Sequence, residues 1–68
     1  MKISVFIEKS NEKQIVELKS NSKVVDLLKT LNINPTTVLI ARDSNIITED
    51  VLLKDKDNIK ILSVISGG

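Results

Sequence analysis

The residues best placed for chemistry stand at the end of the sequence, which closes with Val64-Ile65-Ser66-Gly67-Gly68. The chain has only two glycines, and both occur here. Because glycine carries no Cβ, Gly67-Gly68 forms a thin, freely bending strip of backbone that ends in a bare carboxylate. We predict that residues 66–68 are a flexible tail suited to a narrow slot on another protein. A merely frayed chain end would have the same composition.

The residue types that the sequence lacks argue against most other chemistry. There is no Cys and no His, so neither a Cys-His or Ser-His-Asp nucleophile nor an ordinary zinc site is available. No glycine-rich loop is present to hold a phosphate group. We therefore predict that the chain is not an enzyme and binds no metal or cofactor of its own.

Length and charge indicate one small domain. A chain of 68 residues buries only about 60% of its unfolded surface, so its stability margin is narrow. The core must be aliphatic, because the chain contains one Phe and no Trp, Tyr or Cys. The net charge is +1 without a basic block, which argues against nucleic-acid binding. Neither a membrane span nor a signal peptide is visible, so we expect a cytoplasmic protein, away from membranes and monomeric when free.

The apolar pattern predicts five strands. Residues 1–8 alternate, with Ile3, Val5 and Ile7 on one face and Phe6 on the other, which is typical of a strand. Residues 13–18 follow after a polar turn and complete a hairpin. Residues 38–42 and the short pair 46–47 are expected as further strands, and residues 59–65 as the last one.

Residues 23–31 predict one amphipathic helix between the second and third strands. Its apolar stripe consists of Val24, Leu27, Leu28 and Leu31. Ser22 stands where an N-cap is expected, and Asn32 where a left-handed residue would end the helix.

This order predicts a two-layer α+β domain in which one main helix packs on a mixed sheet of four to five strands. The first and last strands should lie side by side in the middle of that sheet. The tail would then leave the domain from its best-packed strand.

The pattern resembles the β-grasp, ubiquitin-like sulfur carriers of the ThiS and MoaD type and their archaeal modifier relatives. The resemblance covers residues 1–68 as a single domain. It is carried by the element order, by Val25-Asp26-Leu27-Leu28, by Leu53-x-Asp55-x-Asp57-x-Ile59-x-Ile61 and by the final Gly67-Gly68. The sequence departs from the family by lacking prolines before the glycines and an Asn-Gly at Asp43-Ser44-Asn45. These departures leave the pathway open.

The resemblance implies a role for Gly68. An adenylating enzyme of the ubiquitin-activating type would use ATP and magnesium, both bound on that partner, to convert the Gly68 carboxylate to an acyl adenylate. A sulfur nucleophile would then give a thiocarboxylate for a downstream sulfur acceptor enzyme in thiamine, molybdopterin or tRNA thiolation. Gly67 and Ser66 would let the backbone enter the partner.

Two alternatives remain open from the sequence. The same activated Gly68 could join target-protein lysines, which would make the chain a covalent protein modifier. Alternatively, the domain could be a non-covalent β-grasp interaction module with an inert tail.

Either carrier role needs a surface that binds a partner. Phe6, Leu62 and Val64 fall on the strand face opposite the predicted core and would form an apolar patch near the tail root. Arg42 is a further candidate because it could steer an acidic partner toward this patch. The alternative is that loops or outer strands cover the apolar residues.

Overall fold

The computed structural model describes residues 1–64, and residues 65–68 lie outside the description. Its elements are β1 (Lys2–Ile7), β2 (Glu12–Glu17), α1 (Val24–Thr30), the 3₁₀ helix η1 (Pro35–Thr37), β3 (Val38–Arg42), β4 (Asn45–Ile47) and β5 (Asn58–Ser63). The predicted order of strands and helix is therefore confirmed. Only β3 has the predicted bounds, and the other elements begin or end one or two residues away from them. The first strand ends at Ile7, for example, and the last strand ends at Ser63.

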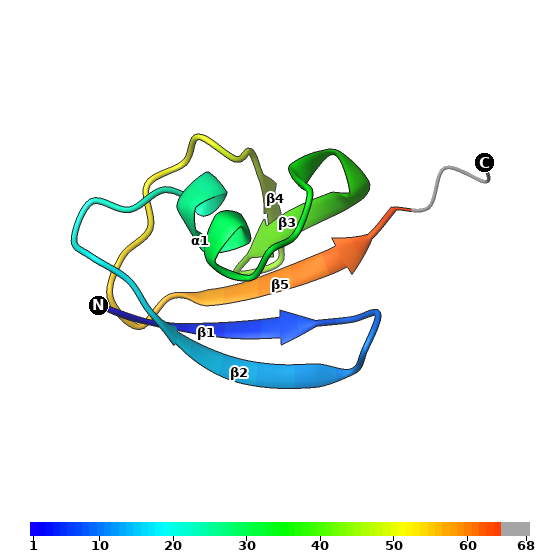
Figure 1. The fold of residues 1–68 in the computed structure, drawn as a ribbon, viewed down its shortest axis with the longest axis horizontal. Helices are drawn as coiled ribbons and strands as arrows, with labels where there is room; N and C mark the ends of the chain where they lie inside the picture. The colour runs from blue at the N-terminus through cyan, green and yellow to red at the C-terminus, as the bar shows by residue number, and fades with distance from the viewer. Residues whose placement is uncertain (65–68) are drawn as a thin grey trace.

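The five strands form one mixed sheet in the order β2-β1-β5-β3-β4. β1 and β5 are parallel neighbours at its centre, and the remaining pairs are antiparallel. Helix α1 covers one face of the sheet (Figure 1), which gives the two layers of an α+β fold. The predicted central position of the first and last strands is confirmed.

The core lies between α1 and the covered face of the sheet. Alternation places Ile3 and Val5 of β1 and Ile59 and Ile61 of β5 on this face, all at most 2% exposed. The helix contributes a stripe from the same side, as its 3.6-residue period requires. The stripe consists of Val24, Leu27 and Leu28, which are fully buried, and the half-buried Leu31.

The start of α1 differs from the prediction. The N-cap is Lys23, not Ser22, and the Asp26 carboxylate accepts a hydrogen bond from the Lys23 backbone N–H at 2.8 Å. The Ser22 hydroxyl donates instead to the Lys19 carbonyl at 2.7 Å. A bridge between Lys23 and Leu52 keeps Lys23 extended, so the helix begins one residue later than the sequence suggests.

Helix α1 ends at Thr30, one residue before the predicted end, and the predicted left-handed residue is confirmed. Leu31 is the C-cap, and Asn32 has φ 58°, the left-handed conformation expected there. The chain then enters η1, which the sequence analysis did not anticipate. The Asn34 side chain caps η1 by accepting from the Thr36 backbone N–H at 3.0 Å.

Candidate interaction surface at the tail root

Strand β5 is the last element before the end of the chain. It is an inner strand, which pairs with β1 from Asn58 to Ile61 and with β3 from Ile59 to Ser63. One residue beyond it, the Val64 N–H donates to the Thr37 carbonyl at 3.0 Å. The predicted reactive residue Gly68, together with Gly67 and Ser66, lies outside the described residues.

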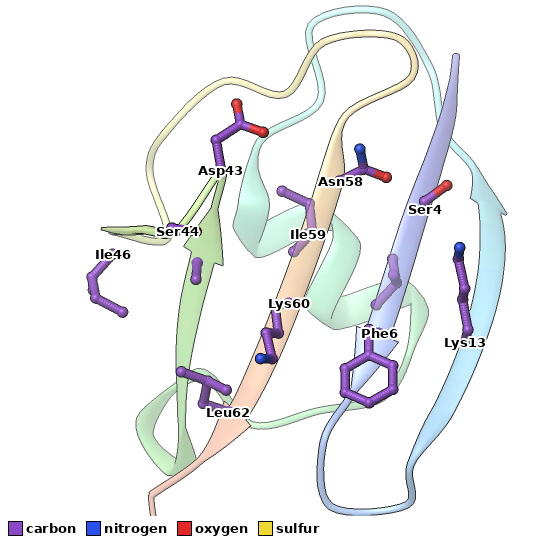
Figure 2. A pocket seen from close by; sticks show the side chains of 12 residues that line it. Ser4, Phe6, Lys13, Asp43, Ser44, Ile46, Asn58, Ile59, Lys60 and Leu62 are labelled. Atoms are coloured by element: carbon purple, nitrogen blue, oxygen red, sulfur yellow. The ribbon is translucent and has the colours of Figure 1, made fainter.

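The structure brings Phe6 and Leu62 to the same hollow. Both side chains are half-buried on the sheet face opposite α1 (Figure 2), because they alternate with the core residues of β1 and β5. The hollow has a volume of about 670 Å³ and is lined by residues of all five strands and of the β3–β4 turn. We call this uncovered side of the sheet the open face.

Two lysines that the sequence analysis did not single out flank Phe6. Lys13 of β2 pairs with Phe6 on one side, and Lys60 of β5 pairs with it on the other. The Lys60 ammonium lies 5.9 Å from the centre of the Phe6 ring, within the range of a cation–π contact. Alternation already places Lys60 with Leu62, but only the register between strands shows that Lys13, Phe6 and Lys60 form one row.

The row continues across the sheet through Ala41 and Ile46. Ala41 is 7% exposed and has only a methyl group, whereas Ile46 of the edge strand is 58% exposed. Leu39, which pairs with Leu62, is 46% exposed. The open face therefore has a depression at Ala41, and longer apolar side chains surround this depression.

Val64 does not line this hollow. It borders a second hollow of about 570 Å³ on the side of the sheet that carries the α1–η1 loop, together with Ile7, Ile33 and Val38. Val64 is 44% exposed. The three predicted apolar patch residues thus divide between the two hollows that flank the end of β5.

The structure does not place Arg42 with the other predicted patch residues. It pairs with Ile59 near the start of β5, whereas Val38 pairs with Ser63 at the tail end. Its guanidinium donates to the Asp57 carboxylate and to the Leu52 carbonyl, both at 3.1 Å. Arg42 is therefore engaged in holding the loop before β5, at the opposite end of the strand from the tail root.

The two perturbed carboxylates also belong to that distant loop. A hydrogen bond from the Lys2 backbone N–H, at 2.8 Å, lowers the pKa of Asp55. The Thr48 hydroxyl lowers the pKa of Asp50 in the same way. Both shifts come from contacts that shape the loop between β4 and β5, so neither marks a reactive group.

Within residues 1–64, no three His, Cys, Asp or Glu side chains gather as metal ligands would. The single α-helix in this part of the chain is also far too short to cross a membrane. The described residues do form an exposed, partly apolar surface beside β5.

The order of the strands in the sheet and the single helix packed on it define a ubiquitin-like β-grasp fold. The model of the ThiS family matches residues 4–68, and the chain belongs to that family. It is 35% identical over 57 residues to the sulfur carrier protein TtuB of Thermus thermophilus, which covers 84% of this chain and 88% of that relative.

A solved structure supports the fold. The chain superposes with a TM-score of 0.65 on a ubiquitin-like protein from the hyperthermophilic archaeon Caldiarchaeum subterraneum. That similarity covers 98% of this chain and all of the other, at 14% identity. The β-grasp architecture and the membership in a ThiS-type family, both expected from the sequence, are confirmed.

Proposed function

We propose that this chain is a sulfur carrier whose terminal Gly68 carboxylate is activated and converted to a thiocarboxylate by partner enzymes. The observation that carries the proposal is the membership in the ThiS family over residues 4–68, which includes Gly67-Gly68. The position of β5 supports it, because the last strand before those residues in the sequence is an inner strand of the sheet. The name of the relative TtuB, a sulfur carrier protein, points the same way.

The chemistry that we assign to Gly68 takes two steps. A carboxylate oxygen attacks the α-phosphorus of ATP, and pyrophosphate leaves as the acyl adenylate forms. A nucleophile at the oxidation level of sulfide then attacks the acyl carbon, so that a C–S bond forms while the C–O bond to AMP breaks. The adenylating partner holds ATP and magnesium, and this chain supplies the acyl group.

This chain contributes positioning rather than catalysis in our proposal. A group held in the right geometry reacts far faster than a free one, and the carrier must therefore be gripped close to its tail. We assign that contact to Phe6 and Leu62 on the open face and to Val64 in the second hollow, on the other side of the sheet.

The test is to incubate the purified protein with a ubiquitin-activating-type adenylating enzyme, ATP and sulfide. Intact mass spectrometry should show the gain that corresponds to exchange of one oxygen for sulfur, located at Gly68 by fragmentation. A variant without Gly67-Gly68 is the matched control and should show no gain. An unchanged mass of the wild-type chain, with pyrophosphate release also absent, would contradict the proposal.

Two further experiments test the alternatives. A covalent modifier would yield proteins joined through Gly68 to lysine amines. After tryptic digestion of cell extracts, these lysines would carry residues 61–68, because Lys60 is the last tryptic site of the chain. An interaction module with an inert tail would keep its cellular function after removal of Gly67-Gly68. Either result would replace sulfur transfer as the main role of this chain.

A further inference from the structure

The open face carries positive charge in a defined place. Lys13, Phe6 and Lys60 are direct neighbours on three adjacent strands, so two ammonium groups flank the one aromatic ring of the chain. Both lysines are exposed. Of the residues that line the hollow, only Asp43 in the β3–β4 turn is acidic.

Beside this basic pair lies an apolar depression. Ala41 is the neighbour of Lys60 on β3, and Ile46 is the next residue of the row on β4. Leu62 lines the same hollow one row closer to the tail. A side chain from another protein that entered above Ala41 would therefore contact aliphatic groups on two sides and the Lys60 stem on a third.

We propose that the open face docks an acidic segment of the adenylating partner, and this inference rests on the proposed function. An aliphatic side chain of that segment enters the depression over Ala41, and carboxylates beside it pair with Lys13 and Lys60. Charge complementarity selects this occupant, because two cations within an apolar surface favour an acidic and aliphatic partner over a neutral one.

The same charges argue against two other occupants. A second copy of the chain would place Lys13 and Lys60 against the identical lysines, and such like-charge contacts are unfavourable. A nucleic acid would need a larger basic surface, whereas the net charge of this chain is +1. The Lys60 contact with the Phe6 ring also occupies a position where a base would have to stack.

The test measures ATP–pyrophosphate exchange by the purified adenylating enzyme as the concentration of the carrier is varied. The variant is Lys13→Glu with Lys60→Glu, and the control is Lys19→Glu, which makes one identical charge change at an exposed residue after β2. Thermal melting checks that each variant is folded. We expect the double reversal to raise KM for the carrier by about tenfold or more with kcat unchanged, because misplaced interface charge weakens association.

Two further variants separate charge from shape. Lys13→Gln with Lys60→Gln should give a smaller rise in KM and reduce its dependence on salt, since the attraction is removed without being reversed. Ala41→Leu should raise KM while leaving the salt dependence as in the wild type, because it fills the depression and keeps both lysines.

The outcomes distinguish this inference from the proposed function. If the wild-type chain supports no exchange, the carrier function fails and the docking inference falls with it. If the wild type supports exchange but the double reversal changes KM no more than Lys19→Glu does, the carrier function stands and the docking inference is wrong. The docking inference is also wrong if the charge reversals leave KM unchanged and instead alter dimerisation, measured by sedimentation, or the binding of a single-stranded RNA oligonucleotide.

Discussion

The contacts of Asp57 should determine much of the stability of this small domain. One Asp57 carboxylate oxygen accepts from the Lys54 backbone N–H at 2.8 Å and from the Arg42 guanidinium at 3.1 Å. The same Arg42 nitrogen donates to the Leu52 carbonyl. These contacts attach the loop before β5 to β3, and Asp57→Ala would remove two of the three.

The expected cost follows from burial. The Arg42 and Asp57 side chains are 23% and 14% exposed, so their ion pair is only partly screened by water. We assign about 1 kcal/mol to it, the upper end for exposed pairs, and about 1 kcal/mol to the hydrogen bond from Lys54. Asp57→Ala should then lower the free energy of unfolding by about 2 kcal/mol, or Tm by roughly 10 °C for a domain of this size. Asp57→Asn, which keeps an acceptor for Lys54, should cost about half as much.

Urea denaturation of Asp57→Ala, Arg42→Ala and the double variant measures these terms, with Glu17→Gln as a control for loss of an exposed carboxylate. Together with the wild type, these variants form a double-mutant cycle. The cycle should give a coupling free energy of about 0.5–1 kcal/mol between Arg42 and Asp57. Additive effects would refute the assignment of the pair as a structural contact. A raised KM of folded Arg42→Ala for the adenylating enzyme would instead restore the partner role that the sequence suggested for Arg42.

Three further predictions concern local contacts. The pKa of Asp55 lies below its ordinary value of 3.8, so its contribution to stability is present above that pH and is lost as the pH falls through the lowered value. Acid titration of Asp55→Asn should therefore show a weaker loss of stability in this range. Asp26→Ala should destabilise the protein by about 1 kcal/mol in urea because it removes the acceptor at the start of α1, and Ser22→Ala should cost less. Ser44→Gly should raise Tm, with a gain of about 1 kcal/mol, because Ser44 has φ 69° in the two-residue β3–β4 turn, whereas Ser44→Ala should not.

The fold could be predicted because its signals are local. The alternation in β1 and β5 depends only on residues close together in the sequence, and so does the apolar stripe of α1. Both patterns are observed in the structure. The helix start could not be predicted in this way. A serine before an apolar stripe is a good N-cap, but the bridge between Lys23 and Leu52 joins residues far apart in the sequence and moves the cap to Lys23.

The candidate site was predicted only in part for the same reason. The face of Phe6 and Leu62 follows from alternation, which is a property of each strand by itself. The row of Lys13, Phe6 and Lys60 depends on register across three strands, and a slip of one residue would destroy it. The charge of Arg42 is visible in the sequence and suggests a contact with a partner, whereas its contact with Asp57 is visible only in the structure.

The position of β5 connects this row to the proposed chemistry. Lys60 and Ser63 belong to the same inner strand, and three residues of strand span roughly 10 Å. A partner that holds the open face at Lys60 therefore also fixes where the backbone leaves the sheet, because hydrogen bonds to β1 and β3 prevent β5 from shifting. Recognition and acyl transfer can then use separate residues. This separation is why substitutions on the open face should change KM while removal of Gly67-Gly68 abolishes the reaction itself.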